Sequence, residues 1–140
     1  MLQKMLVEQT KSRARHSNDN GLVEGKNNAI VRKTFGYIHI PKKFAELMNT
    51  FNKKFFNPYI NFHRQCAFAT DTVDAKGKVK KKYGTHLTPF EKLASLPNAE
   101  QYLKPGMTLA RLRRIEQEYD DITFAELKEQ ERSKLFKSLS

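Results

Sequence analysis

Apolar residues recur mostly at helical spacing along this chain. Between residues 22 and 34, Val23, Ile30 and Val31 give a largely polar segment an apolar side, which predicts an amphipathic helix. The three residues before it, 18–20, read Asn-Asp-Asn, and such side chains accept hydrogen bonds from the free N–H groups of a helix start. Gly36 then predicts the end of the helix.

A second helix is predicted to begin at Pro41, because the N–H that proline lacks is not needed at the first helical position. Pro58 is expected to kink or interrupt it, since proline removes a donor and crowds the preceding turn. Along this second helix, five apolar residues recur at helical spacing and form a mostly aromatic stripe, namely Phe44, Leu47, Met48, Phe51 and Phe55. A stripe of this kind is more often core than a platform for stacking bases.

The pattern changes from helical to alternating between residues 68 and 83. Residues 74–77, Asp-Ala-Lys-Gly, predict a turn between two strands, and hence a β-hairpin. Side chains alternate along a strand, so Lys78, Lys80 and Lys82 are expected to share one face of the second strand. Such a row of cations suits a phosphate backbone. It serves equally to keep an exposed strand edge from pairing with other chains.

Three more helix starts are predicted downstream. Residues 88–91, Thr-Pro-Phe-Glu, combine a capping residue, a proline at the first helical position and a glutamate that can close a capping box. This helix should end by Pro97. A Pro-Gly break at 105–106 precedes a further amphipathic helix. The spacing Thr-Phe-Ala-Glu at 123–126 predicts the start of a last, highly charged helix that runs to about Leu139.

Composition makes nucleic acid the first class of partner to consider. The chain has 140 residues, enough for one domain or a piece of a larger protein. Its 26 Lys and Arg against 15 Asp and Glu give a formal net charge of +11, which favours polyanionic partners. A solvated basic surface, or ribosome-like packing, is the plainer interpretation. With 39% hydrophobic residues and 10 Phe, the chain is not simply a disordered tail.

Several kinds of site are excluded. Cys66 is the only cysteine, so an internal disulfide and a multi-cysteine zinc site are ruled out. His16, His39, His63 and His86 are too widely spaced for a histidine metal pair, and the proximity of Cys66 to His63 is weak support for a thiol nucleophile. There is no glycine-rich phosphate loop and no nucleophile elbow. No stretch approaches the roughly 18 apolar residues of a membrane span, and no signal peptide is expected.

With these sites excluded, most of the chain resembles a particular family. Residues 10–20, Thr-Lys-Ser-Arg-Ala-Arg-His-Ser-Asn-Asp-Asn, and residues 23–28, Val-Glu-Gly-Lys-Asn-Asn, resemble insertion-sequence transposases with a retroviral-integrase-type catalytic core. Residues 57–64, Asn-Pro-Tyr-Ile-Asn-Phe-His-Arg, are similar to the Tyr-x-Asn-x-x-Arg stretch that follows this core. The helix start at 88–93 is also similar. The resemblance covers roughly residues 5–135.

The resemblance implies a ribonuclease-H-like core and a metal-dependent reaction on DNA. In the family, the pattern Asp-Asn-x-x-x-Glu supplies the last acid of an Asp-Asp-Glu triad, and here it falls on Asp19, Asn20 and Glu24. Three such carboxylates hold two Mg²⁺ (or Mn²⁺) ions about 4 Å apart, one activating the attacking hydroxyl and one stabilising the leaving oxygen. Glu24 is thereby implied as both a catalytic residue and a metal ligand. The plainer interpretation is a first-turn glutamate favoured by the helix dipole.

DNA is the implied partner. Basic residues around Glu24 and on the hairpin are the expected contacts with its backbone. They are Arg13, Arg15, Lys26, Arg32, Lys33, Lys78, Lys80 and Lys82.

The chain departs from the family in its carboxylates. The two Asp of the triad lie well upstream of the Glu, whereas only Glu8 and Asp19 precede Glu24 here. Neither residue can replace the two Asp of the triad, because Glu8 is too close to Glu24 in the sequence and Asp19 already belongs to the motif that contains Glu24. We therefore expect the C-terminal part of a transposase that binds no metal tightly and is inactive without its missing N-terminal part. The alternative is a small non-enzymatic basic protein that binds DNA or RNA through phosphate contacts.

The expected fold is α+β and mostly helical. Residues 1–40 would end the integrase core with a strand near Val7, a loop and the helix that carries Glu24. Residues 41–66 would form a core-packing helix with a proline kink, and residues 67–140 a basic hairpin and a helical C-terminal region. Without its sheet, the Glu24 helix should leave an apolar side partly uncovered, which favours self-association. A reducing bacterial cytoplasm, with the chain on the nucleoid when DNA is bound, is the expected location.

Overall fold

The structure is a computed structural model, and it describes residues 13–16 and 21–139. The described part is mostly helical and contains one two-stranded antiparallel sheet, which confirms the expected α+β class at this level. Two compact units, residues 1–41 and 42–140, make up the chain. The strand expected near Val7 and the Asn-Asp-Asn triplet at 18–20 lie outside the described residues.

In the described part of the first unit, the regular secondary structure is one helical stretch, residues 21–35. It consists of α1 (Gly21–Lys26), a π-helical turn (Asn27–Arg32) and α2 (Lys33–Phe35), and it confirms the helix predicted over 22–34. The predicted end is also confirmed. Gly36 has a φ of 71°, a left-handed conformation that glycine adopts without the steric cost of a Cβ.

The second unit begins with a longer helical stretch, residues 42–63. Its parts are η4 (Lys42–Phe44), α3 (Ala45–Phe51), η5 (Asn52–Phe56) and η6 (Tyr59–His63). The sequence predicts a kink or an interruption at Pro58. An interruption does not occur, because the backbone there stays helical, with φ −60° and ψ −41°. The turns on both sides, η5 and η6, are π-helical. Wider turns of this kind accommodate a residue that has no N–H to donate.

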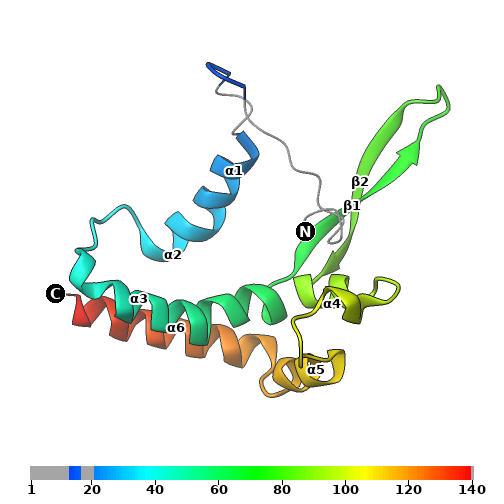
Figure 1. Cartoon of the computed structure of the whole chain (residues 1–140). Helices are drawn as coiled ribbons and strands as arrows, with labels where there is room; N and C mark the ends of the chain where they lie inside the picture. Colours follow the sequence, from blue (N-terminus) through cyan, green and yellow to red (C-terminus); the bar gives the residue numbers. More distant parts are fainter. Residues whose placement is uncertain (1–12, 17–20, 140) are drawn as a thin grey trace. The chain divides into compact units, whose positions relative to one another are not determined.

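This stretch packs side by side with α6 (Asp121–Ser138), and the two run in opposite directions (Figure 1). Phe51 and Leu135 are buried and line one shallow hollow between them. Near the other end, the ring of His63 stacks on Phe124 with centroids 4.5 Å apart. Of the predicted stripe, Phe51 is buried in the core, Phe44, Met48 and Phe55 are half-buried, and Leu47 is 46% exposed. The core role predicted from the spacing is therefore confirmed in part. Residues 42–66 and the C-terminal helices belong to one unit, whereas Pro41 belongs to the first.

The predicted hairpin is confirmed. Strand β1 (Cys66–Val73) pairs with β2 (Val79–Leu87) in an antiparallel ladder (Figure 1). The turn at 74–77 is closed by a hydrogen bond from the Gly77 N–H to the Asp74 carbonyl (2.9 Å), and Gly77 has a φ of 74°. A register shift leaves Gly84 without a partner in the ladder, as expected for a β-bulge at a glycine.

The capping box at the start of α4 (Pro89–Ala94) is also confirmed. The Glu91 N–H donates to the Thr88 hydroxyl oxygen (3.1 Å), and the Thr88 N–H donates to the Glu91 carboxylate (2.6 Å). A short 3₁₀ helix that the sequence did not predict, η7 (Ala99–Tyr102), follows. Then comes the amphipathic helix expected after the Pro-Gly break, α5 (Leu109–Gln117).

The start of α6 differs from the prediction. Asp120 caps this helix, because its carboxylate accepts hydrogen bonds from both the N–H (2.8 Å) and the hydroxyl (2.7 Å) of Thr123. Thr123 therefore lies inside the helix as a donor to the cap. Among the residues that the structure describes, no helix is both long and apolar enough to cross a membrane.

The capping box predicts a measurable loss of stability on Thr88→Ala. The hydroxyl is buried and caps the Glu91 N–H, so its removal should lower the free energy of unfolding by about 1 kcal/mol. Thr88→Ser should recover most of the loss. Urea unfolding followed by circular dichroism measures both. Thr50→Ala, at an exposed position inside α3, is the control and should change stability by less than about 0.5 kcal/mol. Equal losses at both positions would contradict the role of the cap.

Candidate nucleic-acid interface

The register of the hairpin sorts its side chains onto two faces. Thr70 pairs with Lys82 and Thr72 with Lys80, so these four residues form one face, here named the lysine–threonine face. The pair between them in the ladder and the two pairs that flank them lie on the opposite face, here named the valine–tyrosine face. This second face consists of Ala69, Asp71, Val73, Val79, Lys81 and Tyr83.

The expected row of three lysines on β2 is only partly correct. Lys80 and Lys82 share the lysine–threonine face, but Lys78 precedes β2 and belongs to the turn. The Asp74 carboxylate accepts hydrogen bonds from the N–H groups of Lys78 (3.0 Å) and Lys76 (2.9 Å). The Lys78 N–H is the main cause of a pKa for Asp74 below its ordinary value. The ammonium of Lys80 lies 3.2 Å from the same carboxylate.

Lys81 is a cation of the ribbon that the sequence prediction missed. It pairs with Asp71 in the ladder and is exposed on the valine–tyrosine face. The signal was in the sequence, because residues 80–82 are three consecutive lysines. Any strand through such a run turns its middle residue to the opposite face. Cations therefore lie on both faces of the ribbon.

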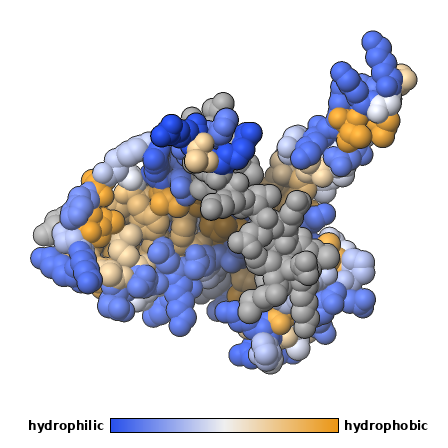
Figure 2. All heavy atoms as spheres, turned by 45° about the horizontal axis from the view of Figure 1, so that its top comes forward, coloured by the Kyte–Doolittle hydropathy of each residue, from blue (hydrophilic) through white to orange (hydrophobic). Residues whose placement is uncertain are grey.

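The valine–tyrosine face also exposes apolar side chains. Val73 is 68% exposed, Val79 64% and Tyr83 62%. Val73 and Val79 oppose each other in the last pair of the ladder before the turn. In Figure 2, the outer end of the hairpin shows an orange, apolar patch bordered by blue, hydrophilic side chains. Apolar and cationic side chains therefore lie together on this exposed face.

The base of the ribbon is attached to the helices. Phe68 of β1 is half-buried, and the Lys92 ammonium of α4 lies 5.5 Å from the centre of its ring. At the end of β2, Leu87 is half-buried and Thr88 begins the capping box. The ribbon thus emerges from packed structure, while nearly all its residues from Ala69 onward are exposed.

In the first unit, Glu24 is exposed on the first turn of α1. Lys26 lies two residues further on, about 200° around the helix axis, so it extends to the other side. The guanidinium of Arg32 lies 5.3 Å from the centre of the Tyr37 ring. All five basic residues assigned to DNA in this unit are exposed. They are Arg13, Arg15, Lys26, Arg32 and Lys33.

The residues that the structure describes do not by themselves form a two-metal centre. Glu24 is the only carboxylate among residues 13–16 and 21–41, and Asp19 lies outside the described residues. Across the described ranges of both units, no three His, Cys, Asp or Glu side chains lie close enough together to hold a metal ion. A metal role for Glu24 therefore depends on carboxylates from beyond the described residues.

The second unit contains a polar pair between buried His63 and exposed Asp121. The side chain of His63 is 2% exposed, and its Nδ1 lies 2.9 Å from the Asp121 carboxylate. The Cys66 thiol has the Arg64 carbonyl as its partner, at 3.9 Å, so the structure does not join Cys66 and His63. Near this pair, burial raises the pKa of Glu116, and the negative charge of Glu91 adds to the effect.

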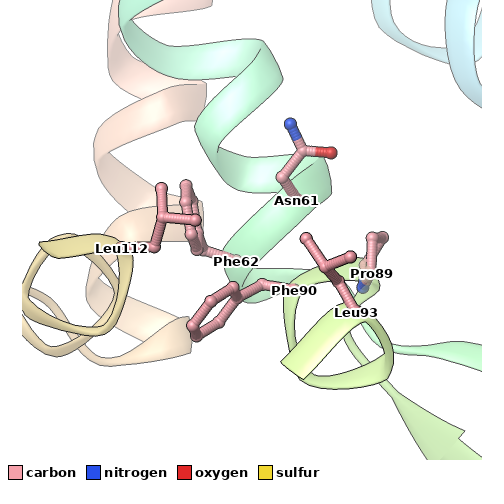
Figure 3. A pocket seen from close by; sticks show the side chains of 6 residues that line it. All are labelled: Asn61, Phe62, Pro89, Phe90, Leu93 and Leu112. Carbon is pink, nitrogen blue, oxygen red and sulfur yellow. The ribbon is translucent and has the colours of Figure 1, made fainter. Parts of the chain in front are cut away.

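An apolar cavity of about 300 Å³ lies where η6, α4 and α5 meet (Figure 3). Asn61 supplies the only polar side chain in its lining, and no titratable group borders it. Its chemistry is that of a packing gap, with nothing to perform acid–base or nucleophilic catalysis. The other lining residues are Phe62, Pro89, Phe90, Leu93 and Leu112.

A scan of protein-family models finds none that matches the chain, and searches of curated proteins and of solved structures find no significant match. Evidence on function therefore comes from the sequence pattern and from the arrangement of side chains.

The raised pKa of Glu116 predicts a pH-dependent effect of Glu116→Gln. The folded carboxyl keeps its proton to a higher pH than the unfolded one, so its cost to stability appears as pH rises above the ordinary value of 4.5. The variant should melt at a higher temperature than the wild type at pH 7, and the gain should vanish below pH 4.5. Melting followed by circular dichroism at both pH values measures this. Glu126→Gln, exposed on α6, controls for the loss of one negative charge. An equal gain in both variants would refute the explanation by burial.

Proposed function

We propose that this chain is the part of an Asp-Asp-Glu-type DNA transposase that carries the third carboxylate and a DNA-binding ribbon. The observation that carries the proposal is the pattern Asp-Asn-x-x-x-Glu over residues 19–24, which leads directly into the helical stretch 21–35. Glu24 is exposed on the first turn of that stretch. A first-turn position leaves a carboxylate accessible to groups supplied by neighbouring structure.

The proposal includes a ribonuclease-H-like core for the complete protein, with the Glu24 helix packed beside its sheet. Exposed apolar side chains in the first unit support this, namely Val31, Tyr37 and Ile38. Contact with a neighbouring sheet would bury these apolar groups, which is favourable. The two remaining carboxylates would come from Asp-bearing strands encoded upstream, as the family pattern implies.

DNA binding by the chain itself is supported by its charge. The net charge is +11, and within the described residues Lys80 is the only lysine of the ribbon with an acidic partner within salt-bridge distance. Unpaired ammonium groups release counterions from a phosphate backbone when they bind it, which supplies sequence-independent affinity. Lys78, Lys80 and Lys82 remain our assigned contacts, together with the basic residues of the first unit.

A non-enzymatic nucleic-acid-binding protein is the second candidate. The observation that favours it is the absence of a carboxylate cluster in the described part of the chain. Both candidates share the basic surface, so DNA binding alone does not separate them. The upstream nucleotide sequence separates the two candidates. Under the transposase proposal, it encodes two Asp-bearing strands in one of its three frames. Several hundred bases of unrelated sequence there would favour the second candidate.

The decisive variant is Glu24→Gln in the protein completed with that upstream segment. The completed protein should cleave or join duplex DNA with Mg²⁺, and the variant should lose more than about 100-fold in rate. Loss of even an outer partner of a metal ligand costs roughly 10–100-fold. The assay is gel analysis of labelled oligonucleotides that carry transposon-end sequences.

Glu46→Gln is the matched control. Glu46 is also an exposed glutamate in the first turn of a helix, α3, so the substitution makes the same charge change at a position without a proposed role. It should keep full activity. Full activity of Glu24→Gln would remove the catalytic assignment. Mg²⁺-dependent nicking by the 140-residue chain alone would overturn the proposal that it needs further carboxylates.

A further inference from the structure

We propose that the β1–β2 ribbon binds in the major groove of duplex DNA, with its valine–tyrosine face toward the base edges and its lysines reaching the phosphates on both sides. This deepens the proposed function and rests on its DNA-binding part. It does not depend on the role of Glu24.

The dimensions of the ribbon fit the major groove. Paired strands lie about 4.8 Å apart, and the major groove is about 12 Å wide, whereas the minor groove is about 6 Å wide. From the Ala69–Tyr83 pair to the Val73–Val79 pair, the ladder contains five consecutive pairs. At about 3.3 Å per residue this length is about 13 Å, which corresponds to roughly four base pairs.

The chemistry of the valine–tyrosine face matches base edges in that groove. Val73 and Val79 present exposed methyl groups, and the thymine C5-methyl is the apolar feature of the major groove. Lys81 and Asp71, paired across the middle of this face, are the residue types that bind guanine O6 and N7 and cytosine N4, respectively. Burial against bases would also cover a hairpin that is only marginally stable by itself.

The distribution of charge on the ribbon fits a DNA groove better than the surface of a protein or a membrane. Between residues 69 and 86, the ribbon has five lysines and two aspartates. Lys81 lies on the valine–tyrosine face, Lys80 and Lys82 lie on the opposite face, and Lys76 and Lys78 lie at the turn. Cations on both faces and at the tip surround the apolar residues. A protein surface or a membrane would meet one face, whereas a groove has phosphates along both walls, within reach of long lysine stems.

The test measures binding of the full chain to a labelled duplex of about 20 base pairs by fluorescence anisotropy. EDTA is present, so metal chemistry plays no part. Lys80→Gln/Lys82→Gln should reduce the slope of log affinity against log salt by about 1.8, since each phosphate contact contributes about 0.9. Lys53→Gln/Lys54→Gln, an equal charge change at exposed positions of η5, should leave the slope nearly unchanged. Equal slope changes in the two double variants would overturn the ribbon as the binding element.

A second comparison tests the groove and the face. Replacing thymine by uracil removes only the major-groove methyl groups, and it should weaken binding of the wild type several-fold. Val73→Ser/Val79→Ser removes the γ-methyl groups from both exposed positions, and it should abolish that thymine preference without changing the salt slope. Circular dichroism and the unfolding midpoint confirm that each variant still folds.

Three results would overturn this inference. They are an absent thymine preference in the wild type, displacement by a minor-groove ligand such as distamycin, and equal affinity for single-stranded DNA. Glu24→Gln should bind like the wild type in this assay. If Glu24→Gln keeps full catalytic activity in the completed protein while the ribbon variants bind as expected here, the proposed enzyme is refuted and the inference about the ribbon remains. If the ribbon variants bind DNA like the wild type while Glu24→Gln abolishes catalysis in the completed protein, only the inference about the ribbon is refuted.

Discussion

The buried contact between His63 and the start of α6 holds the second unit together. The His63 ring stacks on Phe124 and donates a hydrogen bond to Asp121, 58 residues further along the chain. It joins the end of the long helical stretch 42–63 to the first turn of the helix that packs against it. Loss of the Asp121 carboxylate would leave the buried Nδ1 of His63 unsatisfied, at a cost of about 1–3 kcal/mol. Aromatic and aliphatic contacts around Phe51 extend the same interface to the C-terminus of α6.

This contact also determines where the ribbon is attached. β1 begins at Cys66, three residues after His63, and β2 runs directly into the capping box of α4. Both strands are therefore anchored at one end in packed helices, and the contact of Lys92 with Phe68 adds to that anchor. The outer part has no packing of its own. A two-stranded ribbon held only at its base presents both faces to a partner, which is the geometry that insertion into a groove requires.

Local chemistry explains the parts of the fold that the sequence predicted well. The hairpin turn depends on Asp74 and Gly77, and the start of α4 depends on Thr88 and Glu91, which lie within three residues of each other. Such interactions need no distant partner, so they can be recognised in a linear pattern. The same holds for the helix over residues 21–35. The candidate site was less complete. The sequence prediction missed Lys81 although alternation along a strand indicates its face, whereas its partner across the ladder, Asp71, depends on register.

The sequence by itself determined the α+β composition, the positions of most helices and the turn, and the basic character of the ribbon, because these follow from propensity, capping and charge. Only the tertiary structure decided that the helix continues through Pro58, since π-helical turns on both sides form while the stretch packs on α6. It alone decided that His63 joins Asp121 and not Cys66. Residues far apart in the chain become partners only when hydrophobic burial brings their helices together, and no local pattern records that choice.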